Sequence, residues 1–285
     1  MKRKILLSII TSIAIGITAC DKKQKEETSE VKVDSVSIQP VSARPVHWGY
    51  AGEDGPATWA SLSPVYALCG EGKNQSPINI VKTDAKGGAN WKFDYKTTSL
   101  HIAHNEHMED IIDNGHTIQI TVDEGSMFTF GDKTFNLKQV HFHTPSEHTL
   151  DGKHAPMEMH LVHQAADGTL AVVAAFIQEG KTPNENFSKI IANLPNAKGE
   201  TKHVADVNLE LKMHLPKDNF AYHYIGSLTT PPCSEGVQWL VLGNPVYLTA
   251  EQIEAFSSRI GPNNRPTQGL NERQVNVDDL VGSVQ

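Results

Sequence analysis

The chain has 285 residues and a formal net charge of −8 at pH 7, and 39% of its residues are hydrophobic. An acidic chain is poorly suited to the phosphate backbone, so we expect no binding to nucleic acid. The length suits one globular domain, and no stretch after residue 19 is long and apolar enough to cross a membrane as a helix.

The N-terminal segment has the features of an export signal. Met1–Lys4 is basic, and residues 5–19 are apolar but short for a membrane span. The segment ends in Ile17-Thr-Ala-Cys20, which resembles a lipobox and predicts that residues 1–19 are removed and that Cys20 carries a lipid. The alternative is ordinary signal cleavage beside an incidental cysteine. We therefore expect an exported lipoprotein, anchored to a membrane and facing the periplasm or the cell exterior.

Residues 20–45 are polar and have no hydrophobic period, which predicts a flexible tether before a folded domain over 46–285. Within that domain the dipeptides Asn114-Gly115 and Glu124-Gly125 predict turns. Short apolar and β-branched runs predict strands at 93–95, 111–112, 117–122, 127–130, 170–177 and 238–242. Helices are predicted only at 184–192 and 250–258, with Thr249 as the N-cap of the second. The pattern therefore predicts a strand-rich domain.

The most informative motif is Gln139-Val-His-Phe-His143. Alternate residues of a strand share a face, so His141 and His143 point together while Phe142 points the other way. A turn over 144–156 and a return strand over 157–163 would bring His160 to the same face. Three protein nitrogens with an open fourth position are typical of a catalytic Zn²⁺ site.

A single H-x-H pair is more often exposed or hydrogen-bonded than a metal site, so the context of these histidines matters. Gln139 lies two residues before His141, and Glu158 lies two residues before His160. On one strand face, each can accept a ring N–H behind its histidine. Buried polar groups need partners, and a metal centre explains such a set better than core packing does.

Several further motifs occur in an order typical of one family. They are His47-Trp-Gly-Tyr50, Asn74-Gln-Ser-Pro-Ile-Asn79, Asp113-Asn-Gly-His116, Ser146-Glu-His148, Glu158-Met-His-Leu-Val-His163, Ser227-Leu-Thr-Thr-Pro-Pro-Cys-Ser-Glu235 and Asn264-Arg-Pro266. With these motifs and the histidine pair, the chain resembles the α-class carbonic anhydrases, in particular the bacterial ones. The resemblance implies a mainly β single domain, with a central, twisted, mostly antiparallel sheet of about ten strands and short helices on its surface.

The resemblance also implies a zinc lyase that hydrates CO2 reversibly to bicarbonate and a proton, by attack of a zinc-bound hydroxide. Thr229 would orient the hydroxide and donate a hydrogen bond to Glu147. His116 would shuttle the proton, since the unperturbed pKa of imidazole is about 6.5. His101, His104 and His107 are alternatives that would share this work. Thr230 would help to hold bicarbonate or water, and the substrate would meet an apolar wall of Leu228, Val162, Val172 and Trp239.

Two cysteines remain if Cys20 carries lipid, and exported proteins most often pair such cysteines. The resemblance implies the same disulfide, Cys69–Cys233. Bacterial members often form homodimers, although no segment of this sequence identifies an interface. Two other functions are considered: a binding module that has kept the fold but lost activity, which the complete ligand set disfavours, and a zinc esterase, which a narrow apolar cleft would reduce to a side activity.

Overall fold

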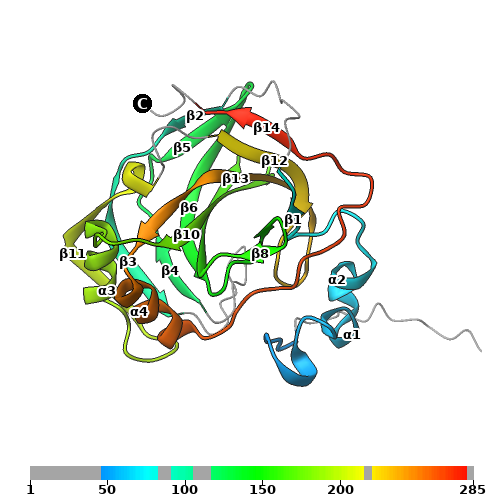
Figure 1. Cartoon of the computed structure of the whole chain (residues 1–285), viewed down its shortest axis with the longest axis horizontal. Helices are drawn as coiled ribbons and strands as arrows, with labels where there is room; N and C mark the ends of the chain where they lie inside the picture. Colours follow the sequence, from blue (N-terminus) through cyan, green and yellow to red (C-terminus); the bar gives the residue numbers. More distant parts are fainter. Residues whose placement is uncertain (1–45, 83–90, 105–116, 215–219, 281–285) are drawn as a thin grey trace, which may run out of the picture. The chain divides into compact units, whose positions relative to one another are not determined.

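The structure is a computed structural model that describes residues 46–82, 91–104, 117–214 and 220–280, all within one compact unit, Ser42–Gln285 (Figure 1). Several predictions lie outside the described residues: the signal segment with Cys20 and the tether, the strand at 111–112, the turn at Asn114-Gly115, and two of the histidines considered for proton transfer, His107 and His116. None of the helices in the described ranges is long and apolar enough to span a membrane.

A large sheet of eleven strands dominates the described part of the chain. Its main path runs β11-β3-β4-β6-β9-β10-β13-β12-β14, while β5 pairs with β6 and β2 pairs with β5. The strands are β2 (Trp91–Asp94), β3 (Thr97–His104), β4 (Ile118–Thr121), β5 (Met127–Phe130), β6 (Lys133–His143), β9 (Met157–Ala165), β10 (Leu170–Glu179), β11 (Thr201–Glu210), β12 (Phe220–Ser227), β13 (Glu235–Leu248) and β14 (Asn276–Asp279). Only β10 and β13 pair in parallel within it. The predicted mainly β, mostly antiparallel single domain is confirmed.

The predicted turn over 144–156 has structure of its own. It contains β7 (Thr149–Leu150) and β8 (Lys153–His154), which form a three-stranded sheet with β1 (Asn79–Ile80). Strands of two residues leave no periodic signal, which is why the sequence pattern indicated only a turn. The return strand itself, β9, lies where it was predicted.

Four α-helices occur in the described residues. They are α1 (Trp59–Leu62), α2 (Leu68–Glu71), α3 (Glu185–Ala192) and α4 (Ala250–Ile260), and three short 3₁₀ helices, η1 (Gly52–Asp54), η2 (Pro64–Tyr66) and η3 (Leu211–His214), accompany them. The two predicted helices are α3 and α4. Thr249 caps α4 in a capping box with Gln252, as the sequence indicated. The prediction of only two helices was wrong, because α1 and α2 are single turns, too short to show a 3.6-residue period.

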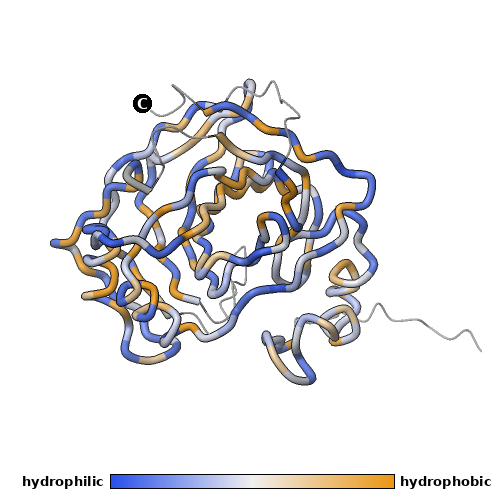
Figure 2. The backbone as a smooth tube through the Cα atoms, viewed as in Figure 1, coloured by the Kyte–Doolittle hydropathy of each residue, from blue (hydrophilic) through white to orange (hydrophobic). Residues whose placement is uncertain are grey.

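The two faces of β6 have different neighbours. Phe142 is fully buried, and its ring centroid lies 4.7 Å from that of Phe256 in α4 and 5.8 Å from that of Phe187 in α3. Hydrophobic residues gather along the central strands, whereas the segment between α4 and β14 is mostly hydrophilic (Figure 2). Helix packing on one face therefore fixes the strand, and His141 and His143 project from the opposite face.

Candidate metal centre

Two neighbouring antiparallel strands bring the predicted ligands together. His141 in β6 is the register partner of His160 in β9, and His143 lies two residues further along β6. One ring nitrogen from each of the three lies within 4.8 Å of the others. All three side chains are buried, with exposed fractions of 5% or less. The strand alternation and the return strand predicted from sequence therefore produce a convergent set of three nitrogens.

The second nitrogen of each ring is held from behind. His141 Nδ1 donates to Gln139 Oε1 at 2.8 Å, and His160 Nε2 donates to Glu158 Oε1 at 2.9 Å, both as the sequence predicted. His143 Nδ1 donates to the carbonyl oxygen of Asn263 at 2.7 Å. These acceptors fix which nitrogen carries the proton in a neutral ring, so His141 Nε2, His143 Nε2 and His160 Nδ1 present lone pairs.

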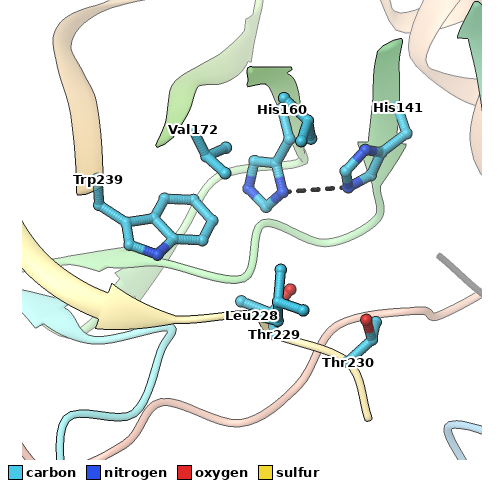
Figure 3. Close-up of a pocket in the computed structure, with 8 residues that line it drawn as sticks. His141, His160, Val172, Leu228, Thr229, Thr230 and Trp239 are labelled. Atoms are coloured by element: carbon cyan, nitrogen blue, oxygen red, sulfur yellow. Dashed lines mark hydrogen bonds between the residues drawn. The ribbon is translucent and has the colours of Figure 1, made fainter. Parts of the chain in front are cut away.

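The arrangement of these lone pairs fits a bound cation. His160 Nδ1 and His141 Nε2 face each other at 3.3 Å, the contact dashed in Figure 3. Two nitrogens bound to one tetrahedral zinc would be separated by roughly 3.3 Å, given Zn–N bonds of about 2.0–2.1 Å. The third, His143 Nε2, is a buried atom without a hydrogen-bond partner among the described residues. A metal ion satisfies all three.

Burial disfavours the charged form of two of these histidines, His141 and His143. Burial lowers the pKa of His141 well below its usual value, and the neighbouring His143 and His160 lower it further. Burial also lowers the pKa of His143, although the nearby Glu147 carboxylate partly opposes this. Neutral imidazole is the form that binds a metal, so His141 and His143 are ready to bind one without first losing protons.

Beside the histidines lies a small cavity of about 20 Å³ (Figure 3). Leu228, Thr229 and Thr230 reach it from the segment after β12. Its complete lining is His141, His160, Val162, Val172, Leu228, Thr229, Thr230 and Trp239. The five residues predicted to contact substrate and the predicted orienting threonine therefore all lie around one cavity next to the candidate metal ligands.

Comparisons with known proteins agree with this geometry. The sequence model of the eukaryotic-type carbonic anhydrases matches residues 54–279. A carbonic anhydrase of Pectobacterium carotovorum is 43% identical over 242 residues, covering 85% of this chain and 95% of that protein. One from Neisseria gonorrhoeae is 40% identical over 231 residues, covering 80% of this chain and 87% of that protein. The chain belongs to the α-class carbonic anhydrases.

Solved structures support the same assignment. The structure of the α-carbonic anhydrase from Thermovibrio ammonificans with the inhibitor sulfanilamide matches with a TM-score of 0.75 at 39% identity, covering 83% of this chain and 100% of that chain. The protein is thus an enzyme that catalyses the reversible hydration of CO2, and its three-histidine site is of the type that holds zinc in the α-class carbonic anhydrases.

Glu158 organises the base of this α-class site. Its Oε2 accepts hydrogen bonds from the backbone N–H groups of Glu147 and His148, both at 2.8 Å. Its Oε1 accepts from His160 Nε2 and from His148 Nδ1, the latter at 2.7 Å. Burial alone would raise the pKa of Glu158, but His148 and His160 together hold it well below the usual value. With its oxygens occupied in this way, Glu158 fixes His160 from behind rather than binding the metal.

The predicted partner of Thr229 is also at the site. Glu147 is fully buried, and its Oε1 accepts a hydrogen bond from the backbone N–H of Arg265 at 2.9 Å. Its Oε2 lies 3.5 Å from His143 Nε2 and 4.0 Å from His160 Nδ1, and has no hydrogen-bond partner among the described residues. Glu147 Oε2 is thus free, within the described residues, to accept the hydrogen bond predicted from Thr229.

The disulfide Cys69–Cys233 is confirmed, with a Cα–Cα distance of 5.0 Å. It joins α2 to the segment that carries the two threonines of the cavity, and the Cys233 N–H donates to the Thr230 carbonyl at 2.8 Å. A disulfide is typical of exported proteins, so the bridge and the bacterial relatives agree with export.

Sequence reasoning missed two supports of the site. Asn263 holds His143 through its backbone carbonyl, and its Nδ2 donates to the Phe142 carbonyl at 3.0 Å. The Arg265 backbone holds Glu147, while its guanidinium donates to the Cys69 carbonyl at 2.8 Å and to the Ser76 carbonyl at 2.7 Å. Asn263 precedes the Asn264-Arg-Pro266 motif and Arg265 lies within it. Their contacts to His143 and Glu147 are made by backbone atoms, which every residue type has, so the sequence could not indicate them.

Proposed function

We propose that His141 Nε2, His143 Nε2 and His160 Nδ1 hold the zinc ion of this carbonic anhydrase, and that CO2 enters the adjoining cavity. One observation supports this above all others. The three rings bring one nitrogen each to within 4.8 Å of the others, and the second nitrogen of every ring is already hydrogen-bonded to Gln139, Asn263 or Glu158. Because all three ligands are neutral, the ion keeps its full charge. A zinc ion held by these residues would act as a Lewis acid that lowers the pKa of water to about 7, an effect for which carbonic anhydrase is the standard example.

The residues around the cavity would then position the reactants. The Thr229 hydroxyl needs an acceptor for its proton, and Glu147 Oε2 is a buried acceptor that has no hydrogen-bond partner in the described parts of the chain. Once its proton is donated to Glu147, the Thr229 oxygen can only accept a hydrogen bond. The site would therefore reject ligands that lack a hydrogen-bond donor. Thr230 supplies a second hydroxyl for bicarbonate or water.

The apolar wall suits a small nonpolar substrate. Val162 and Val172 are register partners on β9 and β10, and Val172 is in turn the register partner of Trp239 on β13. Three adjacent strands thus place three apolar side chains side by side, with Leu228 opposite. A small cavity with an apolar wall suits nonpolar CO2 better than a larger and more polar ester.

We propose that His116 carries protons between the site and solvent, supported by its place in the Asp113-Asn-Gly-His116 motif. The test is His116→Ala, assayed with and without imidazole in the buffer. A shuttle role predicts a lower kcat that added imidazole restores, with kcat/KM little changed. If the kcat of His116→Ala in weak buffer equals that of the wild type, another group carries the protons.

We further propose that the chain is exported and that Cys20 carries a lipid after removal of residues 1–19, so that residues 20–45 tether the catalytic domain 46–285 to a membrane. The lipobox-like end of the apolar segment supports this proposal. Labelling with a fatty-acid analogue in cells should mark the wild-type chain and not Cys20→Ser. The homodimer stays a prediction, and sedimentation of the purified protein tests it.

The zinc assignment is tested by His143→Ala, with His154→Ala as the control because His154 is exposed on β8. Zinc content by mass spectrometry and CO2 hydration by stopped flow are measured on the same samples. His143→Ala should lose both, whereas His154→Ala should keep about one zinc per chain and its activity. Normal hydration by a zinc-depleted His143→Ala variant would contradict the proposal.

A further inference from the structure

Two histidines face each other at the edge of the large sheet, away from the zinc ligands. His101 in β3 and His203 in β11 are register partners, and β11 is the outermost strand on that side. Their Nδ1 atoms are 2.5 Å apart, and their ring centroids are 4.1 Å apart. The side chain of His101 is 32% exposed and His203 is exposed, so solvent reaches both rings.

The ring of His101 is held as a metal-binding histidine usually is. Its Nε2 lies 3.3 Å from Asp123 Oδ1, and Asp123 Oδ2 accepts from the Ser99 N–H at 2.7 Å. The hydrogen bond from the Ser99 backbone is the main cause of the lowered pKa of Asp123. An ionised carboxylate accepts the proton on Nε2 and leaves the Nδ1 lone pair directed at His203. Glu158 holds His160 in the same way, also with Nδ1 left for the metal.

We propose that His101 and His203 form a second metal site, which binds a divalent transition-metal ion through the two Nδ1 atoms, with Asp123 as the carboxylate behind His101. Imidazole nitrogens suit Cu²⁺, Ni²⁺ and Zn²⁺, and Cu²⁺ binds most tightly in that series. Two nitrogens on one ion would be roughly 3 Å apart. The exposed rings therefore need to separate by less than about 1 Å, and water completes the coordination. The bound ion would link the edge strand β11 to β3.

The test titrates Cu²⁺ into the zinc-saturated enzyme, by calorimetry and by electron paramagnetic resonance. We expect one bound Cu²⁺ per chain, nitrogen hyperfine structure from two imidazoles, and a higher melting temperature with Cu²⁺ present. His101→Ala and His203→Ala should each lose the two-nitrogen signal. Asp123→Asn should weaken binding by about 10–100-fold, because the carboxylate only orients the ring. Zinc measured after the titration should remain at one per chain.

The matched control is His47→Ala. His47 is also an exposed histidine facing a carboxylate, with its Nε2 3.2 Å from Asp54 Oδ2. This variant should bind Cu²⁺ like the wild type. The proposal is overturned if the enzyme binds no Cu²⁺ beyond its zinc, if the copper displaces that zinc, or if the two-nitrogen signal survives in either His101→Ala or His203→Ala.

Discussion

Glu158→Gln is the substitution that most sharply probes how the protein holds its metal ligands. The carboxylate accepts four hydrogen bonds in a fully buried position, two on each oxygen. In glutamine one oxygen becomes an NH2 group, which cannot accept. Whichever way the amide turns, two buried donors therefore lose their acceptor. Hydrogen bonds to a charged group contribute about 1.5–3 kcal/mol each, so the free energy of unfolding should fall by about 3–6 kcal/mol.

The same substitution should weaken zinc binding. The loss of the carboxylate behind His160 leaves that ring less firmly oriented, and such changes cost about 10–100-fold in metal affinity. Urea unfolding of the zinc-free protein separates the stability effect from the metal effect, and competition with a chelator measures the zinc dissociation constant. Glu210→Gln is the control, because Glu210 is exposed on the edge strand β11 and should change stability by less than about 0.5 kcal/mol. If Glu158→Gln matches Glu210→Gln in both measurements, the reasoning is refuted.

Three further predictions concern acid stability, the disulfide and the cavity. Burial lowers the pKa of His163 from 6.5 to about 3, so the unfolded chain takes up a proton below pH 6.5 that the folded chain refuses until about pH 3. The stability linked to His163 is therefore complete above pH 6.5 and falls as the pH drops. Between pH 7 and pH 4, the free energy of unfolding in urea should fall by about 3 kcal/mol less for His163→Gln than for the wild type. Equal falls would disprove this. Replacing both Cys69 and Cys233 by serine opens a loop with a sequence separation of 164, and should lower the unfolding free energy by about 5 kcal/mol on the loop-closure model; a loss below about 1 kcal/mol would count against it. Val172→Phe fills the cavity and should lower kcat/KM by on the order of 10²-fold while about one zinc per chain is retained; stopped-flow rates equal to wild type would show that CO2 binds elsewhere.

The metal ligands could be predicted from sequence because they lie on strands. The alternation of His141, Phe142 and His143 reflects a period of two, and Phe142 packs under α4 as that period requires. The residues behind the ligands, Gln139 and Glu158, follow from the same rule. Family resemblance added the segment around Thr229, whose position depends on long-range contacts.

Other parts of the fold leave weak local signals. Strand β3 was not predicted, although it pairs with β11 along most of its length and with β4 over its second half. Its alternation rests on only two large apolar residues, Leu100 and Ile102, which is a short signal. The C-terminal end of β6 is buried on both faces, so its last five residues show no alternation of burial. The Asn263 carbonyl accepts a hydrogen bond from His143, which lies 120 residues away in the sequence, so only the folded structure shows this contact.

The most direct test of the central claim is a zinc titration of the apoenzyme. The purified protein is stripped with a chelator, zinc is added back in steps, and CO2 hydration is followed by stopped flow while bound zinc is measured in the same samples. We predict no catalysis without metal and a linear recovery that ends at about one zinc per chain. Hydration by the stripped protein, or one bound zinc per chain without hydration, would contradict the claim that His141, His143 and His160 hold a catalytic zinc.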